Sequence, residues 1–291
     1  MSILITGADG FIGRHLSQYL LSKGHTVILM SRRVSARHDC WQADLTDTTL
    51  DLPEGVDIVI HLAAASPQVG RTLDCYLENN VQGTQNLIDA CVGAGIKRFI
   101  FASAVDCYMD ISSPIVDESN LNGARATKTG SSYGWTKLFC EHLLYQVSNE
   151  FQILIMRLPG IIGPGCGDPW IGRVTDKMLG DQCVEFYAPE SFFNATLHVD
   201  NLCAFLNQQI SREWQKECDV VNLACTQPLT IKEILRTIKK WTGSNSRLVE
   251  REPQSPPFLL NIEKATDQYG FRPSSVQATI EKFLAALKVC L

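Results

Sequence analysis

Two side chains in the middle of the chain have types and spacing that suit proton transfer. Tyr133 and Lys137 stand four positions apart in the segment YGWTK, so a helix would place them on one face. A free tyrosine has a pKa of roughly 10 and is a poor base at neutral pH. We expect nearby positive charge to lower that pKa, which would let Tyr133 exchange a proton with a carbonyl or alcohol oxygen. The alternative is an ordinary pair of side chains on a helix surface.

A glycine-rich segment at the start of the chain, TGADGFIG at 6–13, predicts a site for a dinucleotide. It follows a short apolar strand at 3–5 and opens a helix, which is the context that gives three spaced glycines their meaning. Gly7, Gly10 and Gly13 would permit a sharp turn and a close approach of the backbone to a pyrophosphate. The alternative is a tight turn with a structural role only.

The end of the second expected strand, at 26–31, indicates which dinucleotide is bound. An acidic residue there would hold the ribose hydroxyls and select NAD. This chain has Ser31, Arg32 and Arg33 instead, and Arg14 lies in the first turn of the preceding helix. Guanidinium groups and a hydroxyl suit a 2′-phosphate, so the sequence favours NADP(H), with NAD(H) as the alternative. A solvated basic turn would give the same pattern.

Apolar strands alternate with amphipathic helices through the first half of the chain. We expect strands at 3–5, 26–31, 57–61, 98–103 and 152–158, and helices at 11–24, 75–94 and 131–149. This order predicts an α/β fold, a Rossmann-like doubly wound parallel sheet with a smaller C-terminal α+β substrate domain. We assign 1–160 to the dinucleotide-binding domain, to which some later segments return, and 161–291 mainly to substrate binding.

The composition excludes several classes of function. A net charge of -5 argues against a general binder of nucleic acid or anionic membranes. The 11 cysteines are scattered without metal-ligand spacing, so we expect reduced thiols, no metal and a cytoplasmic protein. The first residues lead into a strand rather than a signal peptide, and we find no apolar run long enough to span a bilayer.

Seven motifs in order along the chain define a resemblance to a known family. They are TGADGFIG at 6–13, ADL at 43–45, HLAA at 61–64, NNVQGTQNL at 79–87, YGWTK at 133–137, RLPGIIGPG at 157–165 and LHVDNL at 197–202. Together they resemble the extended short-chain dehydrogenase/reductase superfamily, in particular the NAD-dependent epimerase/dehydratase family that modifies nucleotide-activated sugars. The resemblance implies a Rossmann domain, a small substrate domain and a homodimer formed through the helices near 76–94 and 133–148.

The resemblance also implies which residues contact the cofactor. Tyr133 and Lys137 would hold the nicotinamide ribose and exchange the proton while a hydride moves. The other predicted contacts are Gly7, Ala8, Asp9, Gly10, Phe11, Ile12, Gly13, Ser31, Arg32, Arg33, Asp44, Leu45, Leu62, Ala63, Ala64, Asn80, Pro159 and Ile161.

The chain departs from the family where a third catalytic hydroxyl is usual. The family places Ser or Thr four residues before a tyrosine, and Ala104 stands at that position here, before Tyr108. Our hypothesis is that Ser103, one residue earlier, substitutes for it. Asp106 lies where sugar 4,6-dehydratases of this family carry an acid, and it would move a proton if its pKa were raised. A solvated loop aspartate is the alternative.

Two further departures concern the substrate. Gly160 replaces the asparagine that commonly follows the RLP element, and Asn194 stands near the position of a diphosphate-binding arginine. A diphosphate needs some cation, so Arg173, Lys177 or Arg251 would replace that arginine. We therefore predict substrate contacts at Ala104, Gly160, Arg173 and Arg251. His198 and Asp200 we assign to structure, as a strand end and a helix cap.

Three functions remain open from the sequence. The first is an NADPH-dependent reductase of a nucleotide-linked 4-keto-6-deoxy sugar, favoured by the basic turn at 31–33. The second is a nucleotide-sugar epimerase or dehydratase that retains its cofactor and returns the hydride. The third is a catalytically weak NADP-binding sensor or partner protein, which the alanine at position 104 favours.

Overall fold

The computed structural model describes residues 1–32, 40–68, 70–108, 113–120, 131–167, 169–253 and 256–288. Arg33, a predicted contact of the cofactor phosphate, lies outside these residues. The chain divides into two compact units. The first unit is drawn from 1–109, 121–157 and 206–221, and the second from 110–120, 158–205 and 222–291.

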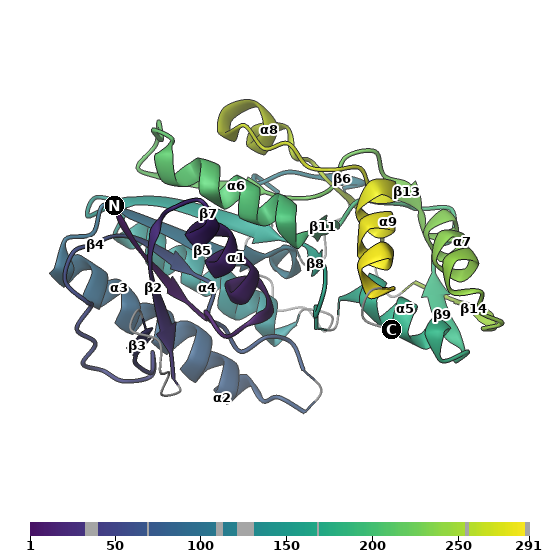
Figure 1. Ribbon diagram of the computed structural model, residues 1–291, viewed down its shortest axis with the longest axis horizontal. Helices are drawn as coiled ribbons and strands as arrows, with labels where there is room; N and C mark the ends of the chain where they lie inside the picture. The colour runs from purple at the N-terminus through teal and green to yellow at the C-terminus, as the bar shows by residue number, and fades with distance from the viewer. Residues whose placement is uncertain are drawn as a thin grey trace. The chain divides into compact units, whose positions relative to one another are not determined.

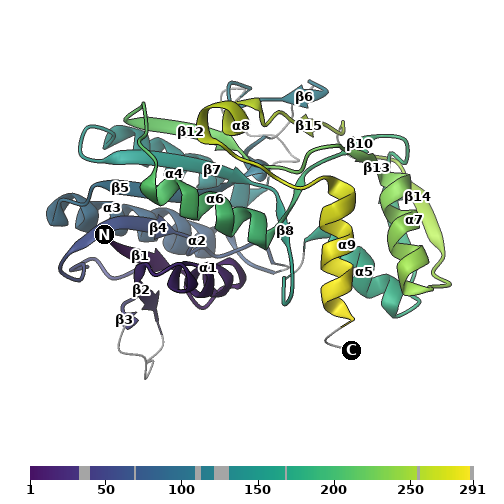
Figure 2. The same ribbon diagram turned by 45° about the horizontal axis from the view of Figure 1, so that its top comes forward.

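The first unit is built on a seven-stranded sheet (Figures 1 and 2). Its strands lie side by side in the order β12 (Cys218–Asn222), β7 (Gln152–Leu158), β5 (Arg98–Ala104), β4 (Val56–His61), β1 (Ser2–Thr6), β2 (Thr26–Ser31) and β3 (Cys40–Gln42), all of which Figure 2 labels. The pairs from β5 through β4, β1 and β2 to β3 are parallel. From β1 the order runs outward in both directions, which confirms the predicted Rossmann-like doubly wound sheet.

Helices cover both faces of this sheet, as Figures 1 and 2 show. The helix α1 lies on the same face as the 206–211 part of α6, and His25 Nε2, just after α1, is 2.8 Å from Asn207 Oδ1. The opposite face carries α3 and α4. The helices concerned are α1 (Phe11–Ser22), α2 (Leu73–Tyr76), η1 (Leu77–Gln82), α3 (Gly83–Ala94), η2 (Val105–Cys107), α4 (Ser132–Gln146) and α6 (Val199–Ser211).

Apolar side chains from strands and helices together fill the core between α3, α4 and the sheet. Phe99, Phe101, Leu87 and Leu144 are fully buried members of this cluster. Such continuous apolar strands, buried on both faces, are the reason that the sequence pattern predicted a parallel sheet.

The helix predicted at 75–94 is interrupted by a π-helical segment, η1. This segment lies between α2 and α3, and it contains the buried Asn80. The helix ends at Gly95, whose φ of 64° lies in the left-handed region that glycine adopts without a steric penalty. A periodicity of 3.6 residues predicts the helix but not the wider turn inside it.

The second unit combines short strand pairs with helices. The pairs β8–β11, β9–β14 and β6–β15 are parallel, and β10–β13 is antiparallel. The elements are β6 (Ile115–Val116), β8 (Gly160–Ile162), α5 (Trp170–Leu179), β9 (Val184–Tyr187), β10 (Phe192–Phe193), β11 (Thr196–His198), β13 (Leu229–Thr230), α7 (Ile231–Thr242), β14 (Leu248–Arg251), β15 (Leu259–Leu260), α8 (Glu263–Tyr269) and α9 (Val276–Leu287).

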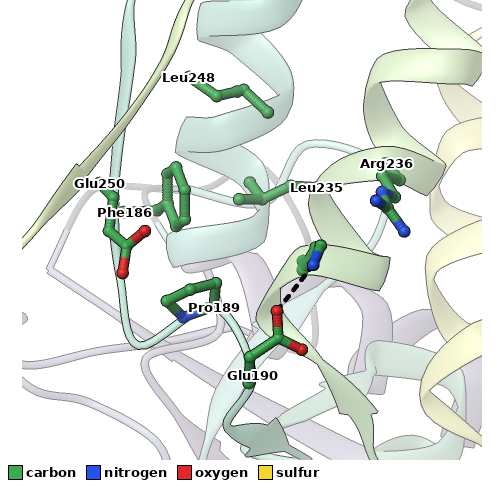
Figure 3. A pocket seen from close by; sticks show the side chains of 8 residues that line it. Phe186, Pro189, Glu190, Leu235, Arg236, Leu248 and Glu250 are labelled. Carbon is green, nitrogen blue, oxygen red and sulfur yellow. Dashed lines mark hydrogen bonds and ion pairs between the residues drawn. The ribbon is translucent and has the colours of Figure 1, made fainter.

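The second unit contains a hollow of about 340 Å³ between β9, β14 and α7 (Figure 3). Phe186, Leu235 and Leu248 give it an apolar wall, and Lys232 Nζ forms an ion pair with Glu190 Oε1 at 2.7 Å on its rim. None of the residues predicted to bind cofactor or substrate lines this hollow.

No helix in the part of the chain that the structure describes is long and apolar enough to cross a membrane. Within the same ranges, no group of three or more His, Cys, Asp or Glu side chains is arranged to hold a metal ion.

Candidate active site

The turn between β1 and α1 is packed so closely that a Cβ atom on Gly7 or Gly13 would collide with backbone atoms. Gly7 has a φ of 66°, and a Cβ atom on it would lie 2.7 Å from the Ala63 backbone nitrogen. A Cβ atom on Gly13 would lie 2.7 Å from the Ala8 Cα and would also collide with the carbonyl oxygen of Gly7. The Gly10 backbone N–H donates to that carbonyl at 2.9 Å, which closes the turn.

Gly10 is the N-cap of α1, and it has no side chain to cap the first turn of the helix. The N–H groups at the start of α1 therefore keep their capacity for an anion, which the helix dipole also favours. Phe11 and Ile12 form that first turn and are half-buried. This cradle fits the pyrophosphate of a dinucleotide.

The residues expected to meet the adenosine ribose form a polar cluster at the ends of β1 and β2. The Ser31 hydroxyl donates to Asp9 Oδ2 at 2.5 Å. Arg14 Nη1 donates to the Asp9 backbone carbonyl at 3.0 Å, and Arg32 is exposed. Asp9, Arg14 and Ser31 together line a hollow of about 180 Å³. A carboxylate therefore stands where the sequence predicted a basic phosphate site.

The loop after β4 touches the glycine-rich turn. The Ala63 backbone N–H donates to Thr6 Oγ1 at 3.2 Å, and Thr6 Oγ1 lies 2.7 Å from His61 Nδ1. The other ring nitrogen of His61 lies 3.0 Å from Thr84 Oγ1. Burial, followed by the positive charge of Lys137, lowers the pKa of His61 to about 3, so this ring is neutral at physiological pH.

Asn80 joins the loop after β4 to α4. Its Oδ1 accepts from the Ala65 backbone N–H at 2.7 Å, and its Nδ2 donates to Thr136 Oγ1 at 3.2 Å. The Cys140 thiol donates to the Asn80 carbonyl. Asn80 thus fixes the helix that carries Tyr133, while its predicted contact with the cofactor stays a prediction.

The remaining predicted cofactor contacts of the first unit occupy structural positions. Asp44 Oδ1 accepts from the backbone and the hydroxyl of Thr46, both at 3.0 Å. Leu45 is buried, and its carbonyl accepts from Asn86 Nδ2 at 2.8 Å. Leu62 and Ala64 stand on either side of Ala63 in the loop after β4.

Tyr133 and Lys137 lie on α4, as their spacing predicted. The helix begins after Ser131, whose hydroxyl accepts from the Gly134 backbone N–H at 3.0 Å. Lys137 is 2% exposed, and its Nζ donates to the Ala102 carbonyl at 2.7 Å. The same Nζ lies 5.8 Å from the centre of the Tyr133 ring.

Burial is the main influence of the protein on the pKa of Tyr133. Burial, followed by the negative charge of Asp106, raises this pKa well above its ordinary value rather than lowering it. Burial also lowers the pKa of Lys137 to about 8. Desolvation of the phenolate is therefore the largest effect of the surrounding protein on this pKa, and the lowering expected from Lys137 and a cationic nicotinamide together stays a prediction.

Asp106 lies beside Tyr133. Its backbone passes so close to Gly134 that any side chain at position 134 would collide with the Asp106 carbonyl. Asp106 keeps an exposed surface, yet the protein atoms around it partly desolvate its carboxyl and raise its pKa. This direction is the one that the proposed acid role requires.

Ser103 is committed to a different cluster. It is 2% exposed, and its hydroxyl donates to Glu141 Oε1 at 2.5 Å. Arg157 Nη2 donates to Glu141 Oε2 at 2.8 Å, and Arg157 Nη1 donates to the Tyr108 hydroxyl at 2.8 Å. Because neighbouring residues of a strand face opposite sides, Ser103 does not occupy the side of β5 to which Ala104 points.

This buried cluster of Ser103, Glu141, Arg157 and Tyr108 was not predicted from the sequence. One signal was available, since Glu141 follows Lys137 by four positions and shares its helix face. The pairing of Asp9 with Ser31 was also missed, although both were predicted to contact the cofactor.

The predicted substrate residues divide between the units. Ala104 ends β5 in the first unit and is 5% exposed. In the second unit, Gly160 begins β8, Arg173 is exposed on α5, and Arg251 Nη2 pairs with Glu185 Oε1 at 2.5 Å.

Other positions beside these residues have structural roles. Asn194 is buried and exchanges two hydrogen bonds with the Leu260 backbone, at 2.9 and 3.0 Å. Asp200 Oδ2 lies 3.5 Å from His198 Nδ1. Pro159 and Ile161 flank Gly160.

A doubly wound sheet whose first strand leads through a glycine-rich turn into a helix defines the class of dinucleotide-binding α/β proteins. The sequence profile described as "NAD dependent epimerase/dehydratase family" matches residues 3–183. The chain belongs to this family, and it is an enzyme of the extended short-chain dehydrogenase/reductase type.

Known proteins similar to this chain include several named for UDP-sugar chemistry. "UDP-glucose 4-epimerase" of Streptomyces lividans is 24% identical over 317 residues, covering 95% of this chain and 93% of that protein. "Uncharacterized UDP-glucose epimerase YtcB" of Bacillus subtilis (strain 168) is 33% identical over 193 residues, covering 56% of this chain and 58% of that protein.

A solved structure, "MoeE5 in complex with UDP-glucuronic acid and NAD", is similar over the whole chain. It shares 25% sequence identity, with a TM-score of 0.84 and 100% coverage of both chains.

Proposed function

We propose that this protein is an NAD-dependent epimerase of a UDP-linked sugar. The observation that carries the proposal is the buried Lys137 one turn after Tyr133, on a helix held against the strand that ends at Ala104. Relatives of similar length named for UDP-sugar 4-epimerisation, and the NAD in the MoeE5 complex, support the substrate class and the cofactor.

The glycine-rich turn at 7–13 would hold the pyrophosphate at the start of α1, and Lys137 would hold the nicotinamide ribose. The bound dinucleotide supplies a hydride acceptor that returns the hydride, so no net reduction results. Lys137 and the cationic nicotinamide would favour the phenolate of Tyr133, which would take the proton of a ring hydroxyl and later give it back to the carbonyl oxygen. Epimerisation requires the keto sugar to present its other face before the hydride returns.

Asp106, rather than Ser103, is the second proton-transfer group in this proposal. The Ser103 hydroxyl already donates to Glu141. Asp106 has a raised pKa, and it lies close enough to Tyr133 for its negative charge to raise the pKa of the phenol. A carboxyl with a raised pKa beside the phenol would exchange a proton with the sugar oxygen at which Ala104 offers no hydroxyl.

A reductase remains the second candidate. Arg14 and Arg32 beside the adenosine end favour NADP(H), and with it the NADPH-dependent reduction of a nucleotide-linked 4-keto-6-deoxy sugar. A dehydratase and a catalytically weak NADP-binding partner protein are further alternatives.

The experiment incubates the purified protein with UDP-glucose and UDP-glucuronic acid and detects the 4-epimers by chromatography. We expect interconversion without added cofactor and without net NADH formation, lost in Tyr133→Phe. Consumption of NADPH with a 4-keto-6-deoxy sugar nucleotide would instead favour the reductase, and dinucleotide binding without any turnover would favour the partner protein.

We also propose a cytoplasmic homodimer. Leu73 and Leu77 before α3, and Phe139 and Tyr145 on α4, are large apolar side chains with 45% to 52% of their surface exposed. Covering them in a dimer would remove apolar surface from water. The described cysteines are free thiols, which is typical of a reducing compartment. Light scattering of wild type and Phe139→Lys tests the dimer.

A further inference from the structure

The second strand of a dinucleotide-binding sheet ends at the adenosine ribose, so the groups there decide between NAD and NADP. In this protein the strand ends at Ser31, which is 8% exposed. Its hydroxyl donates to Asp9 Oδ2 at 2.5 Å. Ser31 therefore holds a carboxylate that comes from the glycine-rich turn, from a residue 22 positions earlier in the chain.

The Asp9 carboxylate supplies, beside the end of the second strand, the acidic group that the sequence at 31–33 lacks. Asp9 immediately precedes Gly10, the N-cap of α1, and it lines the hollow that Ser31 and Leu29 also line. One oxygen of an ionised carboxylate is engaged by Ser31, which leaves further lone pairs to accept from a ribose hydroxyl. A phosphate in the same place would meet a like charge.

Two basic side chains near Asp9, Arg14 and Arg32, belong to the described residues, and neither is fixed against its carboxylate. Arg14 Nη1 is turned to the backbone carbonyl of Asp9 at 3.0 Å, and its side chain is exposed. Arg32 is exposed as well. Asp9 is exposed as well, so water and salt screen all three charges, but the Asp9 carboxylate is held in place by a hydrogen bond from the buried Ser31.

We propose that the Asp9 carboxylate, oriented by Ser31, selects NAD over NADP by accepting a hydrogen bond from the adenosine 2′-hydroxyl and repelling a 2′-phosphate. The inference rests on the proposed function, since it concerns the cofactor of that same site. It assigns to the glycine-rich turn the selecting role that an acid at the end of the second strand would have.

The test measures which dinucleotide the protein retains. Purified protein is dialysed against equal concentrations of NAD⁺ and NADP⁺ and freed of unbound nucleotide. The retained dinucleotides are then released by heat and separated by chromatography. We expect wild type to retain NAD over NADP by roughly tenfold or more, the size of one charge-assisted hydrogen bond. Asp9→Asn removes the charge at constant size, and we expect it to shift the ratio about tenfold toward NADP.

Ser31→Ala is the matched control, because it removes the partner hydroxyl and keeps the carboxylate. We expect its ratio to stay on the NAD side. Equal shifts in Asp9→Asn and Ser31→Ala would mean that the pair only shapes the turn, and this outcome would overturn the proposal, as would retention of NADP by wild type. Higher salt should raise the NADP share of wild type but not that of Asp9→Asn. The wild-type measurement needs no variant, so the proposal stays testable if a variant fails to fold.

The same preparations are assayed for interconversion of UDP-glucose and its 4-epimer, which separates the two proposals. Epimerisation by a protein whose ratio does not depend on Asp9 would overturn the selection and leave the proposed function standing. Selective retention of NAD, lost in Asp9→Asn, without epimerisation would support the selection and refute the proposed function.

Discussion

The glycine-rich turn and the helix that carries Tyr133 belong to the same unit, but different physical effects define them. Contacts between backbone atoms define the turn, where Gly7 and Gly13 leave no space for a Cβ atom. Buried charge defines the helix, where Lys137 is 2% exposed and loses much of its affinity for a proton. A local sequence motif indicates the first arrangement, in which the loop after β4 adds one distant contact, whereas the second depends on every element packed around it.

The turn should be the more sensitive of the two regions. Gly13→Ala would place a Cβ atom against the Gly7 carbonyl and the Ala8 Cα, so backbone must move. We expect a loss of about 1–3 kcal/mol in the free energy of unfolding, as for other overpacked sites, together with loss of dinucleotide binding. Gly93→Ala is the control, because nothing lies within 4 Å of its Cβ position and alanine favours a helix by about 1 kcal/mol. Equal thermal stability of the two variants would contradict this account of the turn.

Tyr133→Phe should test the chemistry without disturbing the fold. Loss of a general acid–base group typically lowers the rate by about 10²–10⁴-fold, and we expect kcat for epimerisation to fall within that range. Dinucleotide retention should remain, because the turn is untouched. Tyr145→Phe removes a phenol from the exposed part of the same helix and should leave kcat unchanged. A Tyr133→Phe enzyme with normal turnover would remove this residue from the mechanism.

Lys137→Met should make the protein more stable at neutral pH. Burial lowers the pKa of Lys137 from 10.5 to about 8. At about 1.4 kcal/mol per pKa unit, the buried ammonium costs about 3 kcal/mol below pH 8. Between pH 8 and 10.5 the unfolded chain binds more protons than the folded chain at this site, so the stability of wild type rises with pH and the advantage of the variant shrinks.

Denaturant unfolding at pH 7 and pH 10 measures this difference. Lys177→Met, at an exposed position of α5, is the control and should show no such pH dependence. An advantage of Lys137→Met that is as large at pH 10 as at pH 7 would show that its cause is packing rather than charge.

Ser103→Ala should have the smallest effect on catalysis. The hydroxyl donates to the buried Glu141, so its removal should cost about 1–3 kcal/mol of stability, as for other hydrogen bonds to charged groups. We expect kcat to change by less than about threefold, because a group bonded away from the reacting oxygen supplies little of the 10²–10⁴-fold effect of acid–base catalysis. Ala104→Ser, one residue later, places a hydroxyl on the other side of β5 and serves as the comparison. A large loss of turnover in Ser103→Ala would restore the hypothesis that it replaces the family's hydroxyl.

Much of the first unit could be predicted from the sequence because its signals are local. Apolar runs gave β1, β2, β4, β5 and β7 within a residue or two, and the spacing of Tyr133 and Lys137 placed them together on α4. The three-residue β3 has no such run, and it forms only because β2 offers it a free edge. The domain division, the roles of the substrate residues and the dimer stay predictions.

Contacts between distant residues could not be predicted in this way. Nothing near Ser31 in the sequence indicates that its hydroxyl meets Asp9, so the basic residues after it determined the cofactor prediction. The direction of the pKa shift of Tyr133 likewise depends on how much protein surrounds the phenol, which spacing along one helix does not reveal.

The π-helical segment over Leu77–Gln82 makes the number of residues in this stretch as important as their identity. In an α-helix each residue turns the chain by about 100°, and a π-helical turn accommodates one residue more. Deleting a single residue here would restore a continuous α-helix and leave the helices on either side on their faces, but residues inside the segment would move around the helix axis, so Asn80 would leave Thr136 and the loop after β4. Evolution can therefore exchange side chains along this helix one at a time, but a change in its length would have to be compensated in the loop and in α4 together.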